Sequence, residues 1–324
     1  MVSAKPQISI LMAVFEPRMD WLKEQLASLN TQTYPNLKLY IRDDCSRTVP
    51  FEDIKNLAGQ CITKFPFVIC RNEENLGSNK TFERLTREAE GSYFAYCDQD
   101  DVWHPRKLEV LQRAIEAEKA ALVCSDVAVI DEHGKKIAET ITRVWPHHVF
   151  LEGPDLAASL LVKNFALGCA MLIRSEIAKA ALPFCPYMVH DHYLALCAAM
   201  KGSIVTLPEP LISHRIHSVN QTSVLAGVTD RKSYYRIRLE ELENRLNWLQ
   251  NRFSDDPELL REIQNAKTWV TAREKWFTGD LSQGGTVWKY RRYSKGASLF
   301  ELTTARMPES LFRHAVKLVQ KGIL

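Results

Sequence analysis

The chain has 324 residues, 46% of them hydrophobic, so it is long enough for about two domains and at least one large core. Its 42 Lys and Arg residues nearly balance its 39 Asp and Glu residues, and the formal net charge of +3 argues against a nucleic-acid partner. No window reaches the roughly 18 consecutive apolar residues of a membrane span, and no signal peptide is recognisable. We therefore expect a cytoplasmic protein, with attachment to the inner face of a membrane left open.

Strand-forming runs alternate with helical patterns between residue 7 and about residue 212. This alternation is typical of βαβ units, so the sequence predicts an α/β domain with a mostly parallel sheet over residues 1–224. The predicted strands are residues 8–15, 37–43, 67–71, 93–97, 121–126, 168–174 and 203–207.

A helical region is predicted over residues 225–324. Apolar residues recur at spacings of three and four over residues 234–253, which indicates an amphipathic helix. Pro257, preceded by capping residues at 254–256, predicts a second helix that packs on the first as a hairpin.

The basic tail, residues 308–324, has two interpretations. Its apolar residues lie mainly on one side of a predicted helix, and Arg313, Lys317 and Lys321 lie on another. Such a helix suits an anionic lipid surface. Alternatively, the apolar stripe packs on the helical hairpin or on a second copy of the chain.

Acidic residues follow two of the predicted strands. Asp98, Asp100 and Asp101 come directly after residues 93–97, and Asp43 and Asp44 lie at the end of another strand. In an open parallel sheet, ligands bind outside the carboxyl ends of the strands. Carboxylates that converge there repel one another unless a cation compensates, which favours Mg²⁺ or Mn²⁺ shared with substrate phosphates.

Two segments resemble the family 2 glycosyltransferases, which are inverting enzymes of the GT-A fold. Residues 10–46 read ILMAVFEPRMDWLKEQLASLNTQTYPNLKLYIRDDCS, and residues 72–109 read NEENLGSNKTFERLTREAEGSYFAYCDQDDVWHPRKLE. The Asp-Gln-Asp-Asp-x-Trp form is similar to the bacterial rhamnosyltransferase-like branch. The resemblance covers about residues 7–220 and implies a Rossmann-like mixed sheet flanked by helices.

The resemblance also implies a donor site for a nucleotide sugar. The first two strand ends would hold the base and ribose, and the loop NLGSNK would pass the diphosphate. This chain has Phe15-Glu16 where the family usually has Tyr-Asn, and the alternative for Asp43 and Asp44 is an ordinary turn. The implied donor-binding residues are Ala13, Phe15, Glu16, Asp43, Asp44, Asn75, Gly77, Lys80, Asp98 and Arg215.

The family's Asp-x-Asp motif falls on Asp98-Gln99-Asp100, so the resemblance assigns Asp98 to the ribose or sugar and Asp100 to a Mn²⁺ or Mg²⁺ ion. The alternative is a solvated acidic turn before a helix. The segment from His214 to Asn220 resembles the family's Tyr-Arg-x-His-x-x-Asn, with His214 replacing Tyr, and adds His217 as a second metal ligand.

An inverting transfer needs a base that takes the proton of the acceptor hydroxyl. Asp191 stands where the family has an acidic residue at the start of a helix, and helix capping is its structural alternative. The residues expected to support the metal or face the acceptor are Asp101, Trp103, His190, His192 and His214.

These features predict a metal-dependent inverting glycosyltransferase of surface polysaccharide biosynthesis. The donor would be dTDP-rhamnose or a UDP-hexose, and the acceptor a hydroxyl of a growing glycan or lipid-linked glycan. Two alternatives remain: a sugar-phosphate nucleotidyltransferase, and a catalytically silent nucleotide-sugar binding or scaffold module. The C-terminal helices would supply a peripheral membrane contact or a homo-oligomer interface.

Overall fold

The computed structural model describes residues 5–146, 148–217 and 225–320. The chain forms two compact units, which we call the sheet unit and the helical unit. The predicted domain boundary at residue 224 lies outside the described residues and stays a prediction. The sheet unit comprises Met1–Leu156, Phe165–Phe184 and Val189–His217, and the helical unit comprises Ala157–Asn164, Cys185–Met188 and Ser218–Leu324.

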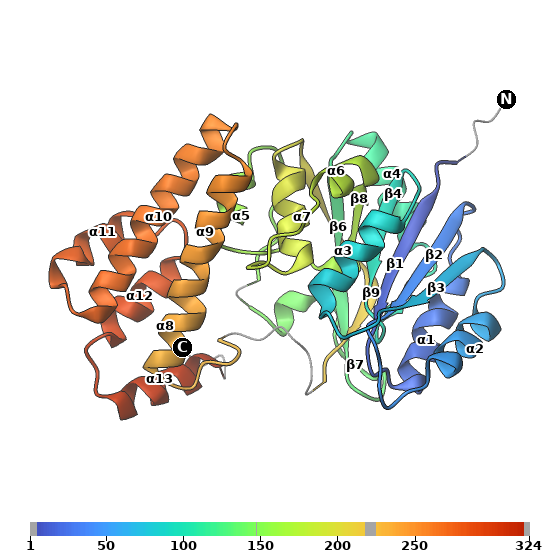
Figure 1. Ribbon diagram of the computed structural model, residues 1–324, viewed down its shortest axis with the longest axis horizontal. Coiled ribbons are helices and arrows are strands. Elements are labelled where there is room, and N and C mark those ends of the chain that lie inside the picture. Colours follow the sequence, from blue (N-terminus) through green and yellow to red (C-terminus); the bar gives the residue numbers. More distant parts are fainter. Residues whose placement is uncertain (1–4, 147, 218–224, 321–324) are drawn as a thin grey trace. The chain divides into compact units, whose positions relative to one another are not determined.

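A mixed sheet forms the centre of the sheet unit (Figure 1). Strands β1, β2, β3 and β4 are parallel, whereas β8 lies between β4 and β6 and runs antiparallel to both. The described residues place the strands in the order β3-β2-β1-β4-β8-β6-β9-β5, with β7 beside β6. Their bounds are β1 (Ile8–Val14), β2 (Leu37–Asp43), β3 (Phe67–Arg71), β4 (Tyr93–Cys97), β5 (Val102–Trp103), β6 (Leu122–Ile130), β7 (Lys136–Ala138), β8 (Met171–Arg174) and β9 (Ile204–Arg215).

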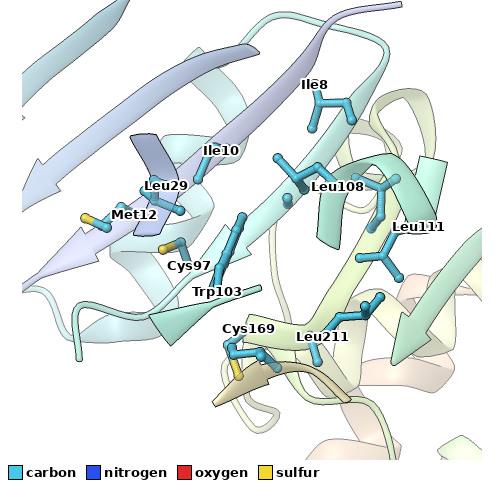
Figure 2. Packing of buried hydrophobic residues seen from close by; sticks show 14 of the residues in the cluster. Ile8, Ile10, Met12, Leu29, Cys97, Trp103, Leu108, Leu111, Cys169 and Leu211 are labelled. Carbon is cyan, nitrogen blue, oxygen red and sulfur yellow. The ribbon is translucent and has the colours of Figure 1, made fainter. Parts of the chain in front are cut away.

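Helices cover both faces of this sheet. Alternate residues of each strand face opposite sides, so Ile8, Ile10 and Met12 of β1 pack in one core with α1, α2 and α4. Figure 2 shows these three side chains with Leu29 of α1 and Leu108 of α4. On the other face, Phe82 of α3 packs edge-on against Tyr96 of β4. The helices of the first face are α1 (Met19–Asn30), α2 (Phe51–Cys61) and α4 (Lys107–Ala117), and those of the second are α3 (Ser78–Glu88), α6 (Ser175–Ala180) and α7 (His190–Ala199). This layered α/β architecture confirms the predicted fold class.

The predicted helical hairpin is present in the helical unit. The Asp256 side chain accepts a hydrogen bond from the Leu259 N–H at 2.9 Å, and Pro257 is the first residue of the second helix of the hairpin. Helices of this unit are α5 (Ala157–Leu160), α8 (Arg231–Tyr235), α9 (Glu241–Arg252), α10 (Pro257–Thr278), α11 (Gly284–Lys289), α12 (Lys295–Thr304) and α13 (Glu309–Gln320), with a π-helical turn at Arg236–Glu240.

The apolar side of the tail helix α13 packs inside the helical unit. Phe312 and Val316 are buried in a cluster that also contains Tyr234. Leu311 stays 55% exposed, and Arg313 pairs with Glu309 at 3.1 Å on the solvent side. The described part of the tail therefore follows the packing interpretation for most of its apolar stripe. No described helix is long and apolar enough to cross a bilayer.

Candidate functional site

The sheet topology gathers most of the predicted site residues at one edge. Strands β1, β2 and β4 are parallel and end there. Because β8 runs antiparallel to β4, the segment before β8 returns to the same edge. Strand β9 is parallel to β6 and also ends there. Segments Asp98–Asp101, Gly168–Ala170 and His214–His217 therefore meet although they are far apart in the sequence.

Asp100 and Asp101 each contact one histidine of the segment at the end of β9. Nε2 of His217 lies 2.9 Å from Oδ2 of Asp100, and Nδ1 of His214 lies 2.9 Å from Oδ1 of Asp101. The Asp101 side chain is fully buried, whereas those of Asp100 and His217 are 18% and 13% exposed. Of these two carboxylates, Asp100 is therefore the one that a ligand can reach.

Burial and neighbouring charges shift the pKa values of the three carboxylates at this edge. Burial, together with Asp101 and Asp100, raises the pKa of Asp98 to about 8. Burial and Asp101 also raise the pKa of Asp100, against the opposing effect of His217. For Asp101, burial acts against ionisation, but contact with His214 outweighs it and lowers the pKa. Negative charge is therefore under-compensated at Asp98 and Asp100.

A divalent cation fits this set of side chains. Mn²⁺ and Mg²⁺ take carboxylate oxygens, and imidazole nitrogen is a further ligand for transition metals such as Mn²⁺. A cation beside Asp98 and Asp100 would offset the repulsion that raises both of their pKa values. The predicted ligands Asp100 and His217 therefore meet the charge and donor requirements of the predicted metal.

A second group of metal-ligating types lies deeper. Ligand atoms of Asp101, Cys169 and His214 lie within 4.8 Å of one another. Burial raises the pKa of the Cys169 thiol, so the sulfur stays protonated at neutral pH and is a poor ligand. Asp101 already accepts hydrogen bonds from His214 and from the Arg215 N–H. This group therefore fits a buried hydrogen-bonded network better than a metal site.

Asp191 lies in the first turn of α7, as the sequence predicted. Its Oδ2 accepts a hydrogen bond from the Gly168 N–H at 3.0 Å, and its charge contributes to the raised pKa of Asp98. The neighbouring His190 ring stacks on Phe82, and burial lowers the pKa of His190 to about 3. His190 is therefore a weak base. His192 is buried in α7.

The two carboxylates at the end of β2 hold loops. Asp43 is buried and pairs with Nε of Arg71 at 3.2 Å. Asp44 is also buried and accepts hydrogen bonds from the backbone N–H groups of Leu76 and Gly77 at 2.9 and 2.8 Å. Asp44 thus shapes the loop that is predicted to pass the diphosphate. Direct contacts of these carboxylates with base and ribose stay predictions.

The end of β1 presents one exposed aromatic side chain. Phe15 is 44% exposed, and Ala13 lies two residues before it, partly buried. Glu16 has a positive φ of 43° and turns its carboxylate away to accept hydrogen bonds from the N–H groups of Arg47 and Thr48. Hydrogen bonds from Thr48 and Arg47 lower the pKa of Glu16. Phe15 therefore offers a free surface, whereas Glu16 is engaged in its own loop.

The loop before α3 is preformed. Gly77 has a φ of +79°, which glycine adopts without strain, and its N–H also points at the Asn75 side chain at 3.1 Å. Lys80, in the first turn of α3, is exposed. The loop thus combines a backbone that can approach a phosphate closely with an exposed cation nearby.

Two predicted site residues are buried in other contacts. Arg215 is 1% exposed, and it donates to the Asp100 carbonyl at 2.8 Å and pairs with Glu24 at 2.6 Å. It therefore holds the acidic turn in place, and a direct contact with the diphosphate stays a prediction. Trp103 is 2% exposed within the hydrophobic core (Figure 2), and its expected role, to support the metal or face the acceptor, stays a prediction.

Sequence reasoning missed three residues at this edge. The Gln99 side chain exchanges two hydrogen bonds with the backbone of Phe15, at 2.8 and 3.1 Å, and so ties β1 to β4. The Trp21 ring lies 4.9 Å from the His217 ring. Lys107 is fully buried, and burial lowers its pKa to about 7. Gln99 stands inside the recognised motif, but Trp21 and Lys107 resemble ordinary residues of amphipathic helices.

A cavity of about 400 Å³ lies at the opposite edge of the sheet, near the start of β6 and the end of β8. It contains none of the predicted site residues. Its lining consists of Lys119, Ala120, Ala121, Arg174, Glu176, Ile177, Ala180 and Lys201.

Comparison with known proteins identifies a family. The model of "Glycosyl transferase family 2" matches residues 9–180. An uncharacterised glycosyltransferase of Nostoc sp. is 24% identical over 290 residues, which span 85% of this chain and 84% of the relative. A putative teichuronic acid biosynthesis glycosyltransferase of Bacillus subtilis, TuaG, is 25% identical over 186 residues, which span 56% of this chain and 68% of the relative.

Solved structures share the fold. TarS of S. aureus, residues 1–349 in complex with UDP-GlcNAc, superposes with a TM-score of 0.60 at 13% identity and covers 98% of this chain and 92% of its own. The mannosyltransferase PcManGT of Pyrobaculum calidifontis, in complex with GDP-Man and Mn²⁺, superposes with a TM-score of 0.56 at 14% identity. The superposition covers 99% of this chain and 83% of the PcManGT chain.

Proposed function

Because the chain belongs to glycosyl transferase family 2, and is thus a glycosyltransferase that uses a nucleotide-sugar donor, we propose that it is a metal-dependent inverting enzyme. The observation that supports this proposal most is the convergence of Asp98, Asp100 and Asp191 at one sheet edge, with His217 on Asp100. The sheet unit, within the predicted domain 1–224, would hold the catalytic site.

Asp191 is proposed as the general base. Its carboxylate would take the proton of the acceptor hydroxyl while the oxygen attacks the anomeric carbon opposite the leaving diphosphate. The N–H groups of Gly168 and His192 each hold one of its oxygens, and a carboxylate oxygen can accept more than one hydrogen bond. His190 and His192 would shape the surroundings of Asp191 without accepting the proton themselves.

Asp100 and His217 are proposed as the metal ligands. A Mn²⁺ or Mg²⁺ ion held there would offset the negative charge that the leaving diphosphate develops. The Mn²⁺ complex of PcManGT, which has the same fold, supports this choice. Asp101 and His214 would hold the acidic turn in the geometry that presents Asp100.

The donor would lie along the ends of β1, β2 and β4. The exposed ring of Phe15 suits stacking on a nucleobase, and Gly77 with Lys80 suits the diphosphate. Asp98 would contact ribose or sugar. The UDP-GlcNAc complex of TarS and the GDP-Man complex of PcManGT support a nucleoside diphosphate sugar. The sequence motif favours dTDP-rhamnose or a UDP-hexose.

The acceptor is proposed to be a hydroxyl of a growing surface glycan, free or lipid-linked. The similarity to the putative teichuronic acid biosynthesis enzyme TuaG supports this class. Membership of the family leaves the nucleotidyltransferase alternative without support, and a silent binding module becomes an outcome of the test below.

The test begins with thermal shift measurements on the whole chain with Mn²⁺ and a panel of dTDP-rhamnose, UDP-hexoses and GDP-mannose. A donor at about 100 times its Kd stabilises the fold by about 2.7 kcal/mol. The selected donor is then incubated with glycan acceptors, and the anomeric configuration of the product is determined by NMR. We expect release of the nucleoside diphosphate, inversion at the anomeric carbon, and loss of turnover in excess chelator.

Three results would contradict the proposal. Retention of configuration would exclude the inverting role of Asp191. Full turnover in chelator, or in Asp100→Ala, would exclude the metal assignment. Donor binding without turnover on a broad acceptor panel would favour the silent module.

A further inference from the structure

Lys107, the first residue of α4, is buried beneath the acidic edge. Its side chain is 0% exposed, and Nζ lies 3.1 Å from the centroid of the Trp103 ring. Nζ also donates a hydrogen bond to the backbone carbonyl of Cys169. Among the described residues, no carboxylate oxygen lies within 4.0 Å of this ammonium group. A buried ammonium is costly, so its contact with Cys169 is a candidate for a specific role.

Cys169 belongs to the 3₁₀ turn Gly168–Ala170, which connects two parts of the site. The Gly168 N–H donates to Oδ2 of Asp191 at 3.0 Å. Sγ of Cys169 lies 4.0 Å from Nδ1 of His214, whose ring is bonded to Asp101. A displacement of this turn would therefore move the contacts of Asp191 on one side and those of the acidic turn Asp98–Asp101 on the other.

The turn packs on α7 without spare room. A Cβ atom at Gly168 would lie 2.7 Å from Nε2 of His190 and 3.3 Å from Cβ of Asp191. Contacts of this kind leave the Gly168 backbone and the start of α7 little freedom to move separately. The position of the Cys169 carbonyl is thus coupled to that of the Asp191 carboxylate.

We propose that Lys107 is a positioning residue for Asp191: its Nζ–H group fixes the Cys169 carbonyl and thereby the Gly168 N–H, which holds Oδ2 of the carboxylate. This inference rests on the proposed role of Asp191 as the base. Figure 2 shows Trp103 and Cys169 on neighbouring segments of the core. Lys107 contacts both, because its Nζ lies over the Trp103 ring and donates to the Cys169 carbonyl.

The test is a double-mutant cycle with Lys107→Met and Asp191→Asn. Methionine keeps the contact with the Trp103 ring but cannot donate to Cys169. The readout is release of nucleoside diphosphate from UDP-glucose, UDP-GlcNAc and dTDP-rhamnose in the presence of Mn²⁺. It is measured with and without the glycan acceptor that the test of the proposed function selects. We expect Lys107→Met to lower kcat about 10- to 100-fold with KM for the donor within about twofold. In the Asp191→Asn background, Lys107→Met should lower kcat by less than about a further twofold. A residue that acts by orienting the base has no effect on kcat once the base is removed.

A second readout needs no substrate. Hydrogen exchange of the Gly168 amide should become about tenfold faster in Lys107→Met, because the turn then no longer holds the Gly168 N–H against Oδ2 of Asp191. Lys55→Met, which replaces an exposed lysine of α2, is the matched control and should change neither kcat nor this exchange rate. Lys107→Arg, which keeps a donor, should restore part of kcat.

Separate outcomes distinguish the two proposals. If Asp191→Asn keeps full turnover, the proposed base is wrong. If Asp191→Asn loses turnover but the effect of Lys107→Met is absent, or is fully additive with it, the inference on Lys107 is overturned. If Lys107→Met does not fold, Lys107→Arg replaces it in the cycle: its remaining loss of kcat should vanish in the Asp191→Asn background, and full additivity would overturn the inference.

Discussion

At the scale of single residues, the acidic edge combines carboxylates whose surroundings differ. Asp101 accepts a hydrogen bond from His214, Asp43 pairs with Arg71, and Asp44 accepts hydrogen bonds from backbone N–H groups. Burial, together with the charges of Asp101 and Asp100, raises the pKa of Asp98 to about 8, against a smaller opposing effect of His214. Asp98 is therefore the carboxylate whose ionisation should respond most to a bound cation.

In metal-free protein, the ionisation of Asp98 should make the free energy of unfolding depend on pH. The pKa of Asp98 is about 8 in the fold and about 3.9 in the unfolded chain, so the folded state binds one proton more between these values. The contribution of Asp98 to the free energy of unfolding should fall as pH rises through this window, by up to about 1.4 kcal/mol per pH unit, and level off above it. Urea unfolding in chelator at pH 4, 6 and 8 measures the slope.

Asp98→Asn is the variant for this measurement. It should be more stable than the original chain at pH 8 and equal to it near pH 4, and Mn²⁺ should stabilise it less. Identical slopes for the two chains would show that Asp98 is ionised or compensated in the fold.

Asp191→Asn tests the base. The single amide oxygen keeps one of the two backbone N–H contacts of the carboxylate, from Gly168 or from His192, so the fold should lose little stability. Donor affinity should be retained, whereas kcat should fall by roughly 10²–10⁴. Steady-state kinetics and donor titration measure the two effects separately. A collapse of donor affinity with kcat intact would move Asp191 to the donor site.

At the scale of elements, the close approach of the turn Gly168–Ala170 to α7 should make Gly168 intolerant of a side chain. Gly168→Ala should destabilise the fold by about 1–3 kcal/mol, because its Cβ meets the His190 ring at 2.7 Å. Gly59 is the matched control: it lies inside α2, and a Cβ atom added there would have no neighbour within 4 Å. Gly59→Ala should therefore stabilise by about 0.5–1 kcal/mol. Thermal and urea unfolding check both, and equal effects would contradict the tight packing.

At the scale of the whole molecule, the two units are stabilised by separate cores. In the helical unit, α13 closes the smaller core through Phe312 and Val316. Phe312→Ala should cost about 3–5 kcal/mol, whereas Leu311→Ser on the exposed side should stay within about 0.5 kcal/mol. Limited proteolysis of residues 225–320 during unfolding measures the stability of each variant. Equal losses of stability in the two variants would contradict the packing of α13 through Phe312.

A peripheral membrane contact stays a proposal for the same helix. Leu311, Arg313 and Lys317 are exposed, so they are the residues that a lipid surface or a second copy could meet. Sedimentation with anionic liposomes, compared between the original chain and Arg313→Ser/Lys317→Ser, separates lipid binding from simple packing.

The sequence alone was enough for the features that depend on local order. Alternating strand and helix patterns predicted the α/β domain, and spacings of three and four predicted the hairpin with its cap near Asp256. Motifs such as Asp98-Gln99-Asp100 and the acid at 191 are also local, so their positions at strand and helix ends could be predicted. Each of these signals arises within about one element of chain.

The tertiary structure decided what each of those residues touches. The insertion of the antiparallel strand β8 beside β4 brings Gly168 to Asp191 and to the acidic edge, and no local pattern encodes that register. It also decided that Arg215 and Trp103 are buried, and that Lys107 lies beneath the site. Burial and pairing depend on contacts between residues far apart in the chain, so they emerge only when the sheet and its helices pack together.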